Sequence, residues 1–290
     1  MNTIWSKYVQ GINTLYFTRK LRFDEIFATQ YKALFALDEK KPLKILEIGC
    51  GPGALAEALH RYYPNAAITA IDRDSEFIRF ARSRETNIDF IEGDATALPF
   101  PDHSFDVTIS NTVSEHIEPS RFYGEQLRVL KPGGICLVLS ARRGIHVTAD
   151  CLTPNEYEKQ FWNKVNAVDD SMERFSVCQY PMSESELPLA MEKYGFHNVS
   201  TAYATIDLTP DHPKYSPETA HNIINANRLC ALDSIESVLH TVPEHVSPEE
   251  IAEMKRLTNA KYDARITQYD RGEKQWDTNV SVTMIVRGEK

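Results

Sequence analysis

The sequence predicts an α/β protein whose central sheet is mostly parallel and carries helices on both faces. Three observations lead to this fold class. A short apolar strand at 43–48 ends in three alternate glycines and is followed by a helix at 54–63. Strand and helix patterns then alternate up to residue 140, which favours parallel pairing of the strands. The chain of 290 residues, 42% of them hydrophobic, is long enough to bury the core that such a sheet needs.

The stretch from Leu43 to Gly53 carries the strongest local signal. Its apolar residues predict a buried strand, and Gly49 and Gly51 permit the positive φ and close ligand approach of a nucleotide-binding turn. These glycines also satisfy a relaxed dinucleotide fingerprint, so an NAD-dependent oxidoreductase is one alternative. Glu47 opposes it, because a carboxylate two residues before the first glycine would repel a pyrophosphate. S-adenosylmethionine (AdoMet), which carries an ammonium group and no phosphate, would tolerate the acid.

The following elements end in polar residues at regular places. A second strand ends in Asp72, where a carboxylate can accept hydrogen bonds from both hydroxyls of a ribose. His116 lies just past the fourth strand, at the edge where open α/β sheets bind ligands. The predicted elements after the first helix are strands at 67–72, 88–92, 105–110 and 135–140, and helices at 74–84 and 121–130.

Three runs resemble motifs of the class I AdoMet-dependent methyltransferases of type 11. They are Glu47 to Gly53, Leu98 to Asp106 and Arg128 to Gly134, and the resemblance covers 42–140. It implies a Rossmann-like, doubly wound, seven-stranded mixed sheet of order 3-2-1-4-5-7-6, whose seventh strand is antiparallel. It also implies in-line transfer of a methyl group to an oxygen, nitrogen or carbon atom of a small-molecule acceptor.

The resemblance assigns roles to individual residues. Asp94 and the amide of Ala95 would read the adenine. Where the acceptor must lose a proton, His116 is the best-placed general base, with His146 and His221 as weaker alternatives. The implied cofactor site comprises Glu47, Gly49, Cys50, Gly51, Gly53, Asp72, Arg73, Asp94, Ala95, Ser110, Asn111 and Tyr16.

The segments before and after the resembling region are longer than those of a family member of minimal size. We expect an N-terminal helical lid at 1–40, a methyltransferase core at 41–210 and 276–290, and a helical insert at 211–275. The insert separates strand six at 197–208 from strand seven at 280–286, and it would form a lid or a homodimer surface. Candidate contacts are Tyr8, Tyr16 and Arg22 for the cofactor, and Tyr215, His221, Tyr262 and Tyr269 for the substrate.

Helix starts in the second half are marked by hydroxyl and carboxylate pairs. Capping boxes are predicted at Thr153–Glu156, Ser183–Glu186 and Ser247–Glu250, and Ser216 followed by proline opens a further helix.

Composition narrows the classes of partner. A formal net charge of −9 argues against a nucleic-acid substrate. No Asn/Asp-Pro-Pro-aromatic run follows the fourth strand, which again favours a small-molecule acceptor. Five cysteines without a CxxC pair imply neither a metal site nor a disulfide framework. Without a signal or membrane-spanning pattern, a cytoplasmic protein is expected. A second alternative is a non-catalytic AdoMet-binding partner or assembly protein.

Overall fold

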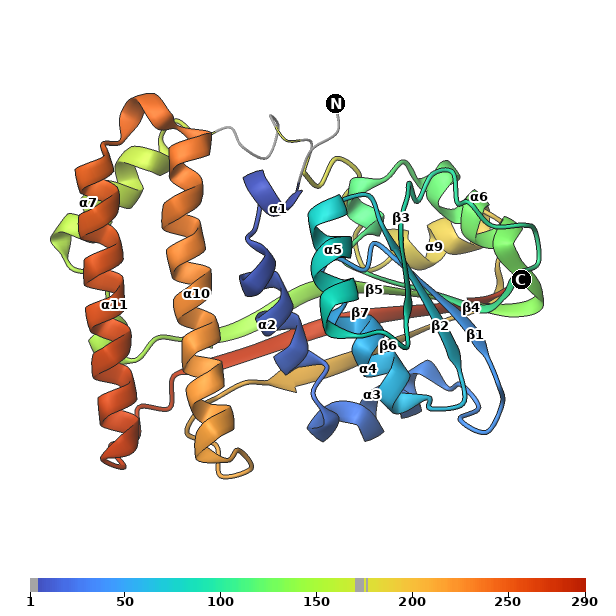
Figure 1. Ribbon diagram of the computed structural model, residues 1–290, viewed down its shortest axis with the longest axis horizontal. Helices are drawn as coiled ribbons and strands as arrows, with labels where there is room; N and C mark the ends of the chain where they lie inside the picture. The colour runs from blue at the N-terminus through green and yellow to red at the C-terminus, as the bar shows by residue number, and fades with distance from the viewer. Residues whose placement is uncertain (1–4, 170–174, 176) are drawn as a thin grey trace. The chain divides into compact units, whose positions relative to one another are not determined.

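The computed structural model describes residues 5–169, 175 and 177–290. Within them, seven strands form one sheet of the order that the resemblance implies, 3-2-1-4-5-7-6 (Figure 1). The strands are β1 (Lys44–Ile48), β2 (Ala67–Asp72), β3 (Asp89–Glu92), β4 (Phe105–Asn111), β5 (Leu130–Val147), β6 (His197–Asp207) and β7 (Thr278–Glu289).

The first five strands pair in parallel and the last strand reverses direction. β1 lies between β2 and β4, and β4 pairs with β5, all in parallel. The Gly133 amide donates to the Lys290 carbonyl oxygen at 3.0 Å, and the Lys290 amide donates to Gly134 at 2.9 Å. The Leu208 amide donates to the Asn279 carbonyl oxygen at 2.9 Å. The end of β7 therefore lies beside the start of β5, and its start beside the end of β6, so β7 is antiparallel to both.

Helices connect the strands and extend the chain at both flanks. The α-helices are α1 (Trp5–Tyr8), α2 (Ile12–Arg22), α3 (Ala28–Phe35), α4 (Ala54–Tyr62), α5 (Ser75–Arg84), α6 (Pro119–Val129), α7 (Glu156–Asn166), α9 (Glu186–Lys193), α10 (Pro217–Thr241) and α11 (Pro248–Asp270). Short 3-10 helices are η1 (Glu25–Phe27), η2 (Ser114–His116), η3 (Asp150–Leu152) and η4 (Pro243–His245). In the part of the chain that the structure describes, no helix has the length and apolarity needed to cross a membrane.

The chain folds into two compact units. The larger unit comprises 22–143, 176–206 and 281–290, and the smaller unit comprises 1–21, 144–175 and 207–280. These boundaries group α1 and α2 with the long helices α10 and α11, and α3 with the sheet. A lid or dimer role for the flanks stays a prediction.

In the larger unit, strand alternation places different side chains on the two faces of the sheet. Leu46 and Ile48 of β1 join a buried apolar cluster with Phe122 of α6 and Met191 of α9. Glu47, between them in sequence, faces the opposite side because successive side chains of a strand alternate. That alternation puts a carboxylate beneath the helix that follows the glycine turn.

Two predicted boundaries are wrong in an informative way. The fifth strand begins at Leu130 instead of residue 135, because Gly133 and Gly134 exchange backbone hydrogen bonds with Lys290, next to the end of β7. The helix predicted at 121–130 begins at Pro119, because the Glu118 carboxylate accepts from the amides of Ser120 and Arg121 and caps it.

The capping predictions are confirmed at two boxes and wrong at one. Reciprocal hydrogen bonds join Ser183 to Glu186 and Ser247 to Glu250, and Ser216 caps α10. The box expected at Thr153–Glu156 forms two residues later, between Asn155 and Glu158. Thr153 is instead the C-cap of the short helix η3, and its amide donates to the Asp150 carbonyl oxygen, so the next helix begins after Asn155.

Candidate functional site

The glycine turn after β1 is held against the end of β2. The amides of Gly49 and Cys50 both donate to the Ile71 carbonyl oxygen, at 2.8 and 3.0 Å. Gly49 has φ +69°, and a Cβ there would lie 2.5 Å from Cγ2 of Val113. A side chain is therefore excluded at Gly49 both by the left-handed backbone and by Val113 in the loop after β4.

Two carboxylates flank this turn. The Gly51 amide donates to Oδ2 of Asp72 at 2.8 Å, and the Asp74 amide donates to its Oδ1 at 2.9 Å. Glu47 is only 2% exposed. Its Oε2 is buried and has no hydrogen-bond partner among the described residues. A buried oxygen acceptor without a donor is costly, so this position favours a ligand that brings a donor.

The electrostatics of the turn favour a cation. Burial, and then the neighbouring Asp72 carboxylate, raise the pKa of Glu47 well above its ordinary value, against the smaller lowering effect of the Ala56 amide. Burial also raises the pKa of Asp72, against the lowering effect of the Asp74 and Gly51 amides. The pKa of the Cys50 thiol is raised well above its usual range by burial and by the same two acids. A positively charged group placed here would stabilise the ionised carboxylates.

The other predicted cofactor residues of the larger unit lie at the ends of β2, β3 and β4. Asp94 is exposed in the turn after β3, where its Oδ1 accepts from the amide and the hydroxyl of Thr96, both at 2.8 Å. Ser110 is fully buried, and its hydroxyl is without a partner within the described ranges. Half-buried Ala95, exposed Arg73 and half-buried Asn111 lie at the ends of the same strands.

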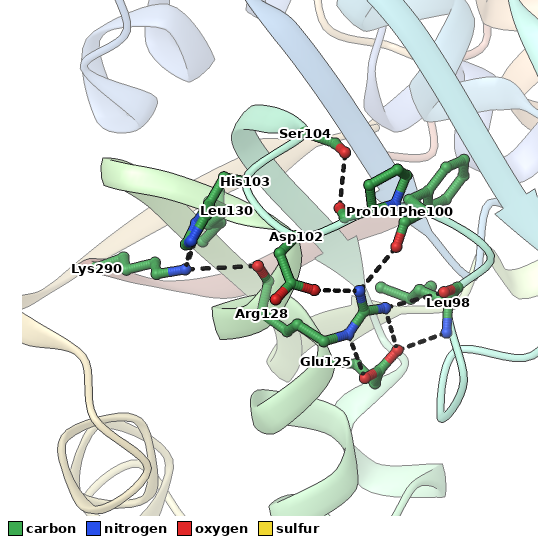
Figure 2. Close-up of polar contacts among 10 residues, drawn as sticks. All are labelled: Leu98, Phe100, Pro101, Asp102, His103, Ser104, Glu125, Arg128, Leu130 and Lys290. Atoms are coloured by element: carbon green, nitrogen blue, oxygen red, sulfur yellow. Dashed lines mark hydrogen bonds and ion pairs between the residues drawn. The ribbon is translucent and has the colours of Figure 1, made fainter.

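The loop before β4 is tied down by one arginine (Figure 2). The Arg128 guanidinium of α6 donates to the carbonyl oxygens of Leu98 at 2.9 Å and Phe100 at 2.7 Å. It also pairs with Asp102 at 2.9 Å and with both carboxylate oxygens of Glu125, at 2.9 and 2.8 Å. The run from Leu98 to Asp106 and the run from Arg128 to Gly134 are therefore joined in the structure. Arg128 holds the loop between β3 and β4 in place.

His116 makes a contact that the sequence did not predict. Its Nδ1 accepts from the backbone amide of Cys178 at 2.9 Å, and the Tyr180 amide donates to the Glu115 carbonyl oxygen at 2.9 Å. Burial lowers the pKa of His116, which Glu115 opposes and Arg73 reinforces. Because Nδ1 accepts, the neutral ring carries its proton on Nε2. A base role for His116, which stays a prediction, would require the Cys178 contact to break.

Several predicted residues lie in the smaller unit, among them Tyr16, His146 and His221. Tyr16 is fully buried and packs edge-on against Phe17 at 5.4 Å. His221 pairs through Nε2 with Oδ1 of Asp270 at 2.7 Å, and His146 is the next-to-last residue of β5. The cofactor role of Tyr16 stays a prediction. Among the described residues, no group of three His, Cys, Asp or Glu side chains could hold a metal ion.

The sheet order and the glycine turn agree with the fold that the resemblance to class I methyltransferases implies. Residues 46–138 match the family model described as a methyltransferase domain. This part of the chain is therefore similar to a methyltransferase type 11 domain, and the chain has homologues among the class I AdoMet-dependent methyltransferases.

Its similarity to individual proteins is concentrated in that domain. The chain is 39% identical over 116 residues to the fatty-acid O-methyltransferase of Mycolicibacterium smegmatis, covering 39% of this chain and 42% of that protein. It is 41% identical over 98 residues to the demethylmenaquinone methyltransferase of Renibacterium salmoninarum, covering 33% and 40% of the two chains. The chain thus matches about two-fifths of the length of these relatives.

A solved structure shares the fold over nearly the whole chain. Phosphoethanolamine N-methyltransferase 2 of Haemonchus contortus, solved with AdoMet, superposes with a TM-score of 0.52 at 17% identity. The match covers 99% of this chain and 59% of that one. At this level of identity the likeness shows the fold alone.

Proposed function

We propose that this protein is an enzyme that transfers a methyl group from AdoMet to a small-molecule acceptor. The observation that carries the proposal is Glu47, a buried carboxylate beside a glycine turn and Asp72, with one oxygen that no described residue donates to. A pyrophosphate cofactor would meet two negative charges there, whereas a methionyl ammonium group would neutralise them. An NAD-dependent oxidoreductase is disfavoured for the same reason.

The chain's own residues would divide the work of holding the cofactor. Glu47 would bind the ammonium group, and Asp72 would accept from the ribose hydroxyls with the lone pairs that the Gly51 and Asp74 amides leave unused. Asp94 and the Ala95 amide would read the adenine edge. AdoMet, when bound, supplies an electrophilic methyl group, so the protein's main task is to align the acceptor with it.

The acceptor class is proposed from the chain and from its relatives. A formal net charge of −9 disfavours a phosphate backbone, and the relatives are named for a fatty acid and a demethylmenaquinone. A fatty acid and a demethylated quinol are therefore the first acceptors to test. Release of S-adenosylhomocysteine with either one would exclude the alternative of a non-catalytic AdoMet-binding protein. Binding without turnover on any acceptor would favour that alternative.

For the insert at 211–275 we retain two proposals, a lid and a homodimer surface. Sedimentation of the purified chain across a range of concentrations separates them. A dimer that dissociates on mutation of exposed insert residues favours the surface, and a monomer at all concentrations favours the lid.

The cofactor is tested by thermal unfolding with AdoMet, S-adenosylhomocysteine, NAD and NADP in parallel. A ligand at a hundred times its Kd stabilises by about 2.7 kcal/mol. For a chain of this size that raises Tm by roughly 5–10 °C. We expect a shift with the two adenosyl ligands alone. A shift with NAD alone would overturn the proposal in favour of the oxidoreductase.

We expect Asp72→Ala to weaken AdoMet binding by about 10–100-fold, because charge-assisted hydrogen bonds to a ribose are each worth about 1.5–3 kcal/mol. S-adenosylhomocysteine should lose affinity equally, since it carries the same ribose. Titration calorimetry measures both. Asp89→Ala, which removes an exposed carboxylate at the start of β3, is the matched control and should bind normally. Unchanged affinity in Asp72→Ala would refute this role.

A further inference from the structure

The inward face of α11 changes character along the helix. At one end, Ile251 and Met254 belong to a buried apolar cluster of the smaller unit. One and two turns later, the inward positions are Thr258 and Tyr262, and then the fully buried Arg265. A helix that only stabilised its partner would continue the apolar stripe. The polar continuation places the hydrogen-bonding groups of Thr258 and Tyr262 on the inward face of α11.

The facing side of α10 leaves space at the same level. Asn227, Cys230, Ala231 and Ser234 are all small, and together with Trp162 of α7 they line a cavity of about 450 Å³. This volume is in the range of small-molecule sites, which are typically about 300–1,000 Å³. All the lining residues belong to the smaller unit, so the cavity is distinct from the glycine turn.

The charges around the cavity are unbalanced. Lys261 pairs with the buried Glu158 at 2.5 Å. Behind the wall, Arg265 pairs with Asp277 at 2.6 Å and with Asp211 at 2.9 Å. This group therefore contains two cationic and three carboxylate side chains, and its net charge is −1. An anionic ligand would meet repulsion, whereas a neutral or cationic one would not.

We propose that this cavity is a binding site for a small amphipathic molecule that is uncharged or carries one positive charge. Trp162 and Met254 supply apolar walls for its body. Tyr262 and Asn227 supply hydrogen-bonding groups for its polar end, and His146 adds an imidazole to the lining. Burial, with Cys230 and Asp277 nearby, raises the pKa of Tyr262 to about 12, so its hydroxyl remains a donor at neutral pH.

The test uses three probes of equal size that differ in charge: 4-phenylbutylamine, 4-phenylbutan-1-ol and 4-phenylbutanoate. Titration calorimetry and tryptophan fluorescence of the full chain should show binding of the amine and the alcohol, and at least tenfold weaker binding of the butanoate. Trp162→Phe should remove most of the fluorescence change while calorimetric binding persists, which locates the probe.

A cavity-filling variant completes the test. Ala231→Phe should weaken the amine and the alcohol at least tenfold, whereas Ala252→Phe, at an exposed position of α11, should not change them. Thermal unfolding checks that both variants fold. The proposal is overturned if no probe binds below about 5 mM, the value expected for a weak fragment of this size. Equal binding to Ala231→Phe, or tightest binding of the butanoate, would also overturn it. Asp72→Ala should leave probe binding unchanged, so this outcome is independent of the proposed methyl transfer.

Discussion

Glu47→Gln is expected to weaken AdoMet binding by about 100-fold or more, because it removes a buried carboxylate from a buried ammonium group, a loss of roughly 3–5 kcal/mol. The amide keeps the size of the side chain and one oxygen acceptor, so packing against the sheet is retained. Binding is measured by titration calorimetry, with S-adenosylhomocysteine as a second ligand that carries the same ammonium group.

Glu47→Gln should also change how the affinity for AdoMet depends on pH. Because the pKa of Glu47 is raised in the free protein, Glu47 holds its proton to higher pH than an exposed glutamate does. A bound cation favours the ionised form, so AdoMet binding should release a proton, and its affinity should rise with pH above the ordinary glutamate range. In Glu47→Gln this rise should be absent.

The contribution of Glu47 to the stability of the free protein should fall as pH rises, whereas the affinity for AdoMet should rise. A glutamate whose pKa is raised in the folded state contributes stability below its unfolded pKa, and this stability is lost as pH rises through the folded pKa. Relative to the parent chain, Glu47→Gln should therefore gain stability as pH rises. Glu39→Gln, an exposed carboxylate paired with Lys32, is the control. Normal AdoMet affinity in Glu47→Gln would contradict the assignment of Glu47 to the cofactor site.

Arg265→Met is expected to lower the free energy of unfolding by about 3–5 kcal/mol, the usual cost of leaving buried charges without their partner. Arg265 is fully buried, and its loss would strand Asp211 and Asp277. Oδ2 of Asp211 would still accept from the amides of Gln275 and Trp276, at 2.8 Å each. Chemical denaturation followed by circular dichroism measures the loss.

Two control experiments distinguish the loss of the buried ion pairs from the general effect of removing an arginine. Arg256→Met removes a mostly exposed arginine of the same helix, paired with Glu253, and should change stability by less than about 0.5 kcal/mol. Adding Asp211→Asn and Asp277→Asn to Arg265→Met should recover much of the loss, because the stranded charges are then gone. Equal stability of the Arg265 and Arg256 variants would contradict this account of the cluster.

Local patterns in the sequence were sufficient for the strand–helix order and the glycine turn. The run from Leu43 to Gly53 combines a buried strand, the turn and the acid of Glu47 within eleven consecutive residues, so the signal is complete without distant contacts. The capping box at Ser247 was readable for the same reason. The box at Thr153 was misplaced because Thr153 ends the short helix η3, and Asn155 with Glu158 offers a second capping pattern two residues later.

Contacts between distant segments had no such local signal. Nothing near His116 in the sequence indicates that Cys178, 62 residues away, would occupy its Nδ1. The pairing of Arg265 with Asp211 joins residues 54 apart, and the cavity beside it depends on three helices and two strands. Neither could be read from periodicity, because a polar residue on a helix face does not show what it will meet.

By itself the sequence determined the fold class, the order of the sheet through a family resemblance, and the residues that line the turn after β1. These depend on hydrophobic periodicity and on glycine stereochemistry, which act over a few neighbouring residues. The folded structure was needed to show that Glu47 is buried with an oxygen that no described residue donates to, that the His116 ring is held by Cys178, and that α10 and α11 line a cavity. Burial and hydrogen-bond partners depend on which segments meet in space, and they set the pKa of each group and its chemistry.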